Sequence, residues 1–376
     1  METRFQRFSR IPNVPAIERI TYFNCSNLEY ASFYLAAMQA GSADHQPDGY
    51  QFRIASRVPA ALRSLLLAPG FEELRETVFL FRAQGQGVDF FFCIDMRDSG
   101  RCGNSKGYHL PLLAGGVRYY FKANIDEQML AEEPLLQAHR DRIVAIEPPF
   151  PVRIEGSLLS WLRIAAGGTA PAGPRGFRRR IRTLRALHPI DQFRQLRGQP
   201  PSSDVFFVMT HYSQAHHAAV AQTRYEIIRE LRQHKGIQAV AGLAASRPLP
   251  EPFESVRVPF YPLPEYLRRL AGSRVGIYVR GPHDALAFKF GEMLALGLPI
   301  VGQKILHNRS LLAGLPRFDE QFAFETPAEI VAQVATLLQD PTRLAALRGS
   351  NTAVFERHLT PAAAMQRIVA TLNQPR

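Results

Sequence analysis

Residues 273–302 (SRVGIYVRGPHDALAFKFGEMLALGLPIVG) constrain the fold of this chain more than any other segment. Residues 275–279 are a short apolar run that favours a β-strand, and residues 280–284 form a turn with a glycine and a proline. Residues 285–296 have helical composition, and Gly297 marks the end of the helix. A strand, turn, helix and second strand in this order are typical of a doubly wound α/β domain. The N–H groups at the start of such a helix favour an anion such as a diphosphate.

Two acidic residues, Asp284 and Glu292, lie near the ends of the expected helix with seven residues between them. Glu292 belongs to the run GEMLALGLPIVG. Together these features resemble the acidic motif and the following Gly-x-Pro signature of GT-B glycosyltransferases, in particular the retaining group 1 superfamily. The resemblance implies that Glu292 binds the ribose hydroxyls of a nucleotide sugar and that Asp284 faces the donor sugar. Retaining families usually have Glu at the first position, so Asp284 departs from their pattern.

The resemblance extends over about residues 204–370, and it has consequences for fold and activity. It implies an α/β fold with two doubly wound, Rossmann-like domains that face each other across a cleft. It also implies a glycosyltransferase that moves a sugar from a nucleoside diphosphate sugar to a saccharide or lipid-linked acceptor. Bacterial enzymes of lipopolysaccharide or capsule synthesis are similar. A strand, turn and helix that end in Gly-x-Pro also occur in other doubly wound domains, where Asp284 caps the helix and Glu292 is a solvated charge.

Length and breaker-rich stretches predict two domains joined by a linker. The chain has 376 residues, and stretches rich in Gly, Pro and Ser span residues 165–174 and 198–203. We predict an acceptor-binding domain over residues 1–150, a linker over 151–203 and a nucleotide-sugar-binding domain over 204–376. Strands are expected at residues 20–23, 89–94, 117–121, 205–209, 237–240, 256–258, 275–279 and 300–301. Helical stretches are expected at residues 29–39, 59–67, 126–139 and 285–296, and from about residues 219, 263 and 310. This alternation predicts parallel sheets covered on both faces.

Composition favours a cytoplasmic enzyme. The three cysteines, Cys25, Cys93 and Cys102, are too few for a disulfide framework and lack the spacing of zinc ligands. The amino terminus has no long apolar run, and no window reaches the ~20 apolar residues of a membrane span. Asp95 and Asp98 are three residues apart with an arginine between them, which is unlike a metal clamp. We therefore expect no metal and no cofactor, with the nucleotide sugar acting as a substrate.

The formal net charge of +12 is concentrated between Arg175 and Arg197, a segment with eight arginines and one acid. An apolar stretch with the single tryptophan, Trp161, precedes it. A tryptophan-bearing turn followed by a basic helix favours an anionic membrane surface, such as the inner face of the plasma membrane. A packed, solvated linker helix is the alternative. Nucleic acid is not expected as a partner because no aromatic interleaving or known binding module accompanies the arginines.

Polar residues after the amino-terminal strands are candidates for acceptor binding and acid–base chemistry. Asp95, Arg97 and Asp98 follow one expected strand, and a Gly/Ser-rich loop leads from them to His109. Residues at the carboxyl end of a strand border the ligand site in doubly wound folds, so Asp95, Asp98 and His109 are candidates for a catalytic base. Arg97 is a candidate acceptor contact, and so are the residues after the next strand, Lys122 and Asn124. Caps and local turns are the alternative for these residues.

In the carboxyl-terminal half, cations near the expected helix start are candidates for the donor diphosphate. Arg280 and Lys289 are the preferred residues. His211 and Arg224, near the first strand of this half, are weaker candidates. His283 and Ala285, in the same turn, are further candidates for binding the donor.

Stereochemistry remains open between two alternatives. Retention, which we favour, places Asp284 beside the donor sugar. Inversion requires a base in the amino-terminal domain. Two other functions stay open. A sugar-nucleotide epimerase would use the same cleft without an acceptor, and a basic membrane- or nucleic-acid-binding module would use only the arginine-rich segment.

Overall fold

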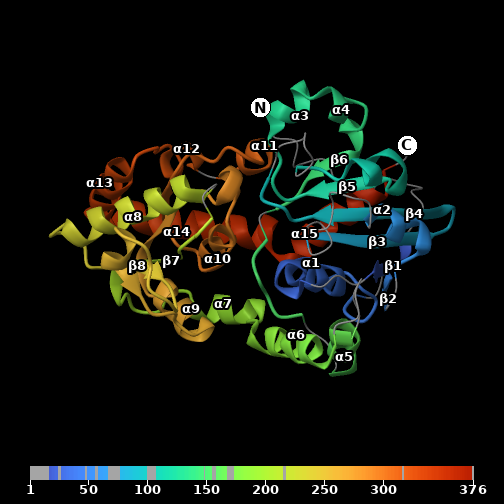
Figure 1. Ribbon diagram of the computed structural model, residues 1–376, viewed down its shortest axis with the longest axis horizontal. Coiled ribbons are helices and arrows are strands. Elements are labelled where there is room, and N and C mark those ends of the chain that lie inside the picture. The colour runs from blue at the N-terminus through green and yellow to red at the C-terminus, as the bar shows by residue number, and fades with distance from the viewer. Residues whose placement is uncertain are drawn as a thin grey trace. The chain divides into compact units, whose positions relative to one another are not determined.

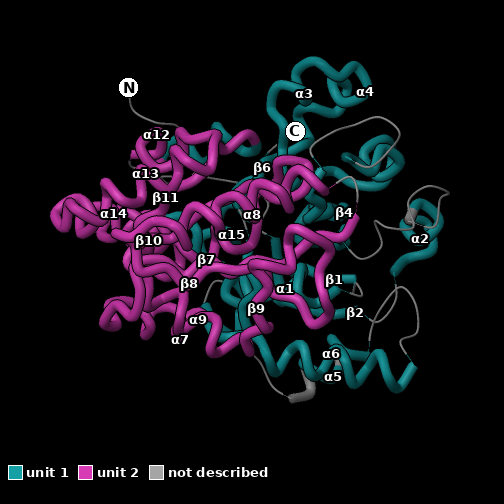
Figure 2. The backbone as a smooth tube through the Cα atoms, turned by 60° about the vertical axis from the view of Figure 1, so that its left-hand side comes forward, with its two compact units in different colours: residues 1–189, 307–314, 358–376 teal, residues 190–306, 315–357 magenta. Residues whose placement is uncertain are grey.

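The computed structural model describes residues 17–23, 27–46, 49–55, 58–66, 77–99, 107–147, 149–154, 158–166, 173–214, 217–315 and 317–374 (Figure 1). The amino-terminal segment before residue 17 and most of the loop that leads to His109 lie outside these ranges. The chain divides into two compact units, each with one sheet. Unit 1 comprises residues 1–189, 307–314 and 358–376, and unit 2 comprises residues 190–306 and 315–357 (Figure 2). The predicted α/β class is confirmed.

The sheet of unit 1 has six strands in the order β2-β1-β3-β4-β5-β6. They are β1 (Ile17–Phe23), β2 (Gln51–Ala55), β3 (Val78–Gly85), β4 (Val88–Asp95), β5 (Tyr119–Lys122) and β6 (Ile143–Ala145). The sequence analysis did not identify β2, β3 and β6, and β3 is antiparallel to both of its neighbours. The two residues between β3 and β4 include Gly87 at φ 71°, and so short a connection allows only antiparallel pairing. The other neighbouring strands are parallel, so the carboxyl ends of β4, β5 and β6 lie at one edge.

Helices accompany this sheet within unit 1. They are α1 (Leu28–Ala40), α2 (Ala60–Leu66), α3 (Glu127–Glu132), α4 (Pro134–Gln137), α5 (Leu158–Ala166), α6 (Pro174–Ala186), α11 (Arg309–Leu312) and α15 (Pro361–Leu372). The single helix expected over residues 126–139 is split into α3 and α4. Pro134 has no N–H to donate and disfavours a helical conformation at Glu133, which is extended at φ −81° and ψ 112°.

The carboxyl-terminal helix α15 packs against α1, near the opposite end of the sequence (Figure 1). Its apolar face, with Met365 and Ile368, is buried. Arg367 on the same helix pairs with the carboxylate of Glu147, which follows β6. Both units are therefore discontinuous in sequence, unlike the continuous domain ranges expected from composition. The binding roles assigned to those ranges stay predictions.

The sheet of unit 2 has five strands in the order β11-β10-β7-β8-β9, and all neighbouring strands are parallel. They are β7 (Ser203–Thr210), β8 (Ala239–Ala244), β9 (Arg257–Val258), β10 (Ser273–Tyr278) and β11 (Ile300–Gly302). The first three strands are added in one direction from β7, and the next two are added on its other side. This is the doubly wound order, and the direction of addition reverses between β7 and β10.

Alternate side chains of β7 and β10 pack against helices on opposite faces of this sheet. The helices of unit 2 are α7 (Ile190–Leu196), α8 (Ala218–Gln233), α9 (Leu263–Ala271), α10 (Phe288–Ala295), α12 (Phe318–Gln321), α13 (Pro327–Leu338) and α14 (Pro341–Val354). Val205 and Phe207 join the core formed with α8 and α13. Phe206 instead contacts Tyr266 of α9, and Tyr278 contacts Phe290 of α10. Both faces are therefore apolar, as a buried parallel sheet requires.

The helix expected over residues 285–296 starts later than predicted. A short 3₁₀ turn spans Pro282–Asp284, Ala285 and Ala287 are extended, and α10 begins at Phe288. The end of the helix agrees with the prediction, because Gly297 adopts φ 66° directly after it. Asp284 is therefore in a turn that precedes the helix by several residues. Within the described residues, no helix is long and apolar enough to cross a membrane.

Candidate functional site

The reversal of strand order in unit 2 is the expected ligand position in a doubly wound sheet. It lies between the carboxyl ends of β7 and β10, which finish at Thr210 and Tyr278. The segments that follow these strands contain most of the residues predicted to bind a donor.

The turn after β10 has a strained backbone. His283 and Asp284 have φ values of 56° and 61°, a conformation that residues other than glycine adopt rarely. Gly281 N–H donates to the carbonyl of Ala285 at 2.9 Å, which closes the turn. Ala285 is buried and contributes through its backbone. Two consecutive left-handed residues are costly, and strain of this kind concentrates at ligand sites.

Arg280 is the charged residue that organises this turn. Its Nη2 lies 2.8 Å from Glu325 Oε2, and its Nε lies 3.4 Å from Asp284 Oδ1. The side chain of Arg280 is 18% exposed, whereas those of Asp284 and Glu325 are 46% and 49% exposed. Arg280 and Asp284, which were predicted separately as site residues, therefore meet in space, and the guanidinium contacts two solvated carboxylates.

Two further predicted cations, the buried Arg224 and the half-buried Lys289, bind the end of β7. Arg224 on α8 donates from Nη1 to the carbonyl of Thr210 at 2.7 Å, and its guanidinium lies 4.5 Å from the ring centroid of Tyr212. Lys289 on α10 donates to the carbonyl of Val208. Burial lowers the pKa of Lys289 to about 8, with Glu292 opposing and Arg224 reinforcing that change. These cations bind the last residues of β7, and their charges give this edge of the sheet a positive electrostatic potential.

Glu292 lies on α10 one turn after Lys289, and it is only 7% exposed. Its charge acts on Lys289, and it adds to the effect of burial in raising the pKa of Tyr266. The predicted ribose ligand is thus part of a buried group of charges next to β7. The structure brings Glu292, Lys289 and Arg224 together as one group, separate from the pair of Arg280 and Asp284.

Aromatic rings line the same edge of the sheet. The ring centroids of Tyr212 and His217 are 5.4 Å apart, and those of His217 and His283 are 5.7 Å apart. His211 packs 4.9 Å from the ring of Phe253, and burial together with the charge of Arg224 lowers its pKa. Sequence reasoning missed His217, although the cluster of histidines after β7 was visible in HYSQAHH.

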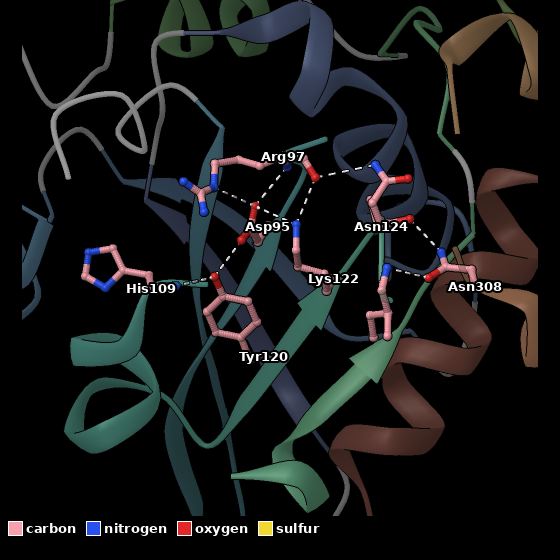
Figure 3. A network of polar contacts seen from close by, with 9 residues as sticks. Asp95, Arg97, His109, Tyr120, Lys122, Asn124 and Asn308 are labelled. Atoms are coloured by element: carbon pink, nitrogen blue, oxygen red, sulfur yellow. Dashed lines mark hydrogen bonds and ion pairs between the residues drawn. The ribbon is translucent and has the colours of Figure 1, made fainter. Parts of the chain in front are cut away.

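Unit 1 contains a second polar group at the carboxyl ends of β4 and β5, shown in Figure 3. Asp95 is fully buried at the end of β4. Its Oδ2 accepts a hydrogen bond from the hydroxyl of Tyr120 at 2.6 Å, and its Oδ1 accepts one from the backbone N–H of Arg97 at 2.8 Å. Both oxygens are therefore already bonded. Tyr120 was not predicted, because a tyrosine inside an apolar strand gives no polar signal.

Lys122, at the end of β5, is also fully buried. Its Nζ donates to the carbonyl of Arg97 at 2.8 Å and lies 3.6 Å from Asp95 Oδ1. Burial lowers the pKa of Lys122 to about 8, and the charge of Asp95 opposes this. Asn124 Nδ2 donates to the same carbonyl at 3.4 Å. The residues predicted on two neighbouring strands thus meet around Arg97.

Asp98 and His109 differ sharply in their surroundings. Asp98 is half-buried, and burial raises its pKa to about 6, with Lys122 lowering it and Asp95 raising it. His109 is fully buried, and its Nδ1 accepts a hydrogen bond from the backbone N–H of Leu112 at 3.2 Å. Burial lowers the pKa of His109 to about 4, so the ring is neutral near pH 7. Of these two base candidates, Asp98 alone is in contact with solvent.

Asn308 is a buried residue of unit 1 that sequence reasoning missed. Its Oδ1 accepts from the backbone N–H of Ile125 at 2.8 Å, and its Nδ2 donates to the carbonyl of Ile146 at 3.0 Å. Nδ2 also donates to the carbonyl of Ala123. Asn308 has φ 53°, which asparagine tolerates better than most residues. It therefore ties together the segments that follow β5 and β6, next to the group around Asp95 (Figure 3).

No family model and no curated protein matches the sequence. Comparison of the fold with solved structures finds glycosyltransferases. One is T4 phage BGT in complex with UDP and Mn²⁺, with 9% identity over 75% of this chain and 82% of that chain and a TM-score of 0.34. Another is the spinosyn forosaminyltransferase SpnP, with 11% identity over 96% of this chain and all of that chain and a TM-score of 0.35. Similarities of this size assign no role to any residue.

The prediction that no metal takes part is corrected, because one of these structures contains Mn²⁺ together with UDP. The described side chains nevertheless do not form a metal cage. No three His, Cys, Asp or Glu residues group as ligands in that part of the chain. Asp95 is bonded to Tyr120 and Arg97, and Asp284 pairs with Arg280. These two carboxylates are therefore already held by other partners.

Proposed function

We propose that this protein transfers a glycosyl group from a nucleoside diphosphate sugar to an acceptor. The observation that carries the proposal is in unit 2. Three cations, Arg224, Arg280 and Lys289, surround the point where the order of a fully parallel sheet reverses. That point is where doubly wound sheets bind nucleotides, and cations there suit a diphosphate.

The three cations have different roles in this proposal. Arg280 contacts the diphosphate directly, because only exposed carboxylates compete for its guanidinium. Arg224 and Lys289 bind carbonyls of β7, so they fix the strand and supply positive potential. Negative charge develops on the leaving diphosphate during glycosyl transfer, and cations already in place stabilise it more than mobile ones do. Glu292 holds the ribose and balances the charge of Lys289.

For the acceptor, we propose unit 1 and the edge formed by β4 and β5. A saccharide or a lipid-linked saccharide, as in surface polysaccharide synthesis, remains the proposed class. Retention, our preferred course, places Asp284 beside the donor sugar. Inversion instead needs a base, and Asp98 suits that role best because its pKa of about 6 is close to neutral. The anomeric configuration of the product, read by NMR, distinguishes the two.

Nucleotide binding tests the donor site. Thermal unfolding of the wild type is measured with UDP, GDP, ADP, CMP and dTDP, each with and without Mn²⁺ or Mg²⁺. A nucleotide present at a hundred times its Kd raises the free energy of unfolding by about 2.7 kcal/mol. We expect one nucleotide to have this effect on the wild type and not on Glu292→Ala.

The matched control for this test is Glu265→Ala, which removes a surface carboxylate of unit 2 that pairs with Arg269 on the same helix. It should respond to the nucleotide like the wild type. Equal stabilisation of Glu292→Ala, or none of the wild type, contradicts the proposed donor site. Release of nucleoside diphosphate only when an acceptor is added distinguishes transfer from epimerisation.

A further inference from the structure

The guanidinium of Arg97 is buried without hydrogen bonds at two of its nitrogens. Its side chain is 10% exposed, and its Nε lies 3.7 Å from Asp95 Oδ1, too far for a hydrogen bond. Neither Nε nor Nη2 has a hydrogen-bond partner among the described residues. Buried donors that lack partners are rare because each costs about 1–3 kcal/mol, more when the group is charged. The site is therefore incomplete without a further acceptor of hydrogen bonds.

Among the described residues, those that contact Arg97 do not supply that acceptor. Both oxygens of Asp95 already accept, one from Tyr120 and one from the backbone of Arg97. Lys122 and Asn124 are donors here, and both bind the carbonyl of Arg97.

These same contacts fix the backbone of Arg97 at its N–H and at its C=O. In Figure 3 its guanidinium lies on the side of Asp95 away from Lys122 and Asn124. The buried group thus fixes the backbone of Arg97, whereas Nε and Nη2 of its side chain have no hydrogen-bond partner among the described residues.

Two cations and two acids form this group, and their balance depends on pH. Arg97 and Lys122 are cations within 3.7 Å of a single carboxylate oxygen of Asp95. The other nearby acid, Asp98, has a pKa of about 6, so it is charged at neutral pH and becomes neutral below about pH 6. Below that pH, Asp95 alone opposes the two cations, and a bound anion can offset the excess positive charge. At neutral pH the argument for an anion rests on the two nitrogens of Arg97 that lack hydrogen bonds.

We propose that Arg97 binds an anionic group of the acceptor, a carboxylate or a phosphate, through Nε and Nη2. A guanidinium matches the two oxygens of such a group with two parallel hydrogen bonds. Lys122, which was also predicted to contact the acceptor, binds the carbonyl of Arg97 and holds that residue in place instead. The assignment to the acceptor rests on the proposed transferase function, whereas anion binding itself does not.

Titration with small probes tests the proposal without donor or turnover. The probes are inorganic phosphate, glucuronate and, as the neutral counterpart, glucose, at constant ionic strength. Binding is measured by calorimetry and by thermal shift on the wild type, Arg97→Gln and Arg97→Lys. The control is Arg82→Gln, which removes an arginine of the same unit from an exposed pair with Asp89. Circular dichroism establishes that each variant is folded.

We expect phosphate or glucuronate, but not glucose, to bind the wild type and Arg82→Gln with the same affinity. Affinity should fall at least tenfold in Arg97→Gln. Affinity should fall severalfold in Arg97→Lys, because lysine keeps the charge but cannot form two parallel hydrogen bonds. If Arg97→Gln does not fold, Arg97→Lys decides.

Undiminished binding by a folded Arg97 variant overturns the proposal, and so does failure of both anions to bind the wild type. Because these titrations contain no nucleotide, they fail or succeed independently of the donor-site test. If the protein binds the anion but has no transferase activity, the anion site stands and its assignment to an acceptor is wrong.

Discussion

Asp98 illustrates how one residue gains chemistry from its position. A solvated aspartate has a pKa of 3.8, but burial raises that of Asp98 to about 6 even though Lys122 opposes the change. The residues next to Asp98 in the sequence do not show that its pKa should differ from that of an ordinary aspartate. The difference arises because hydrogen bonds from Tyr120 and Arg97 hold Asp95, whereas Asp98 is half-buried and experiences the charge of Asp95.

The raised pKa of Asp98 predicts a specific dependence of stability on pH. The folded state binds the proton more tightly than the unfolded state, so the contribution of Asp98 to stability is largest when it is protonated. That contribution should fall as pH rises from about 4 to about 6, by at most about 1.4 kcal/mol per pH unit for one proton. Asp98→Asn should remove this part of the slope.

Urea denaturation of the wild type and Asp98→Asn at pH 4, 5, 6 and 7 measures the effect. Asp89→Asn is a suitable control because Asp89 is an exposed carboxylate whose pKa its partner Arg82 lowers. It should leave the slope between pH 5 and 6 unchanged. Identical slopes for the wild type and Asp98→Asn would contradict the assignment.

At the scale of single elements, the arginine-rich segment is not one helix. It divides into α6 in unit 1 and α7 in unit 2. On α7 and directly after it, Arg194 and Arg197 pair with Glu356, and Arg194 also pairs with Asp191, so two acids balance the two charges. On α6, Arg180 is buried and donates to the carbonyl of Ala165. The exposed basic surface is therefore limited to five residues of α6, namely Arg175, Arg178, Arg179, Arg182 and Arg185.

We propose that this exposed face of α6 binds anionic lipid, and charge reversal tests it. Helix α6 has no acidic residue, and Leu162 on the neighbouring α5 is 37% exposed. A basic residue near an anionic bilayer contributes about 1 kcal/mol. Arg178→Glu with Arg182→Glu should therefore weaken binding to phosphatidylglycerol vesicles by at least about 2 kcal/mol, or roughly thirtyfold.

Vesicle sedimentation at low salt measures this binding. The control is Arg268→Glu with Arg269→Glu, which reverses two charges on α9 in unit 2. It should retain vesicle binding. Equal binding of the α6 variant and the wild type rejects the membrane proposal, and the helix is then a solvated connection.

At the scale of the whole molecule, the discontinuous units decide where a mutation acts. Helix α15 is at the end of the sequence, yet Ile368 is buried in unit 1 against elements near the start. Ile368→Ala should lower the free energy of unfolding of unit 1 by about 2–5 kcal/mol, through lost burial and the cavity that remains. The sheet of unit 2 should be affected much less, although it is nearer in sequence.

Hydrogen exchange of the backbone amides measures this separation. Protection should fall in β1, β3, β4 and β5 of Ile368→Ala and persist in β7, β8 and β10. Val334→Ala is the matched control, because Val334 is a buried residue of α13 in the core of unit 2. It should produce the opposite pattern. Loss of protection in both sheets for either variant would show that the units unfold together.

Local patterns determined much of unit 2. The sequence predicted the apolar strand β10, the end of α10 at Gly297 and the strand β11. These features were predictable because propensity and hydrophobic period act over a few residues. In unit 1, Asp95 and Lys122 were recognised as residues at strand ends, and the structure places them 3.6 Å apart. Their types and their place at the end of a strand were therefore properties of the sequence.

Other features were decided only by contacts between distant segments. The strands β2, β3 and β6, the antiparallel direction of β3 and the packing of α15 on α1 depend on which apolar faces meet, which local pattern does not specify. The same holds for Asn308, whose hydrogen bonds to Ala123, Ile125 and Ile146 join segments far apart in sequence. The two nitrogens of Arg97 that lack hydrogen bonds follow from the same cause. Its neighbours satisfy one another first, and only the folded chain shows which donor is left.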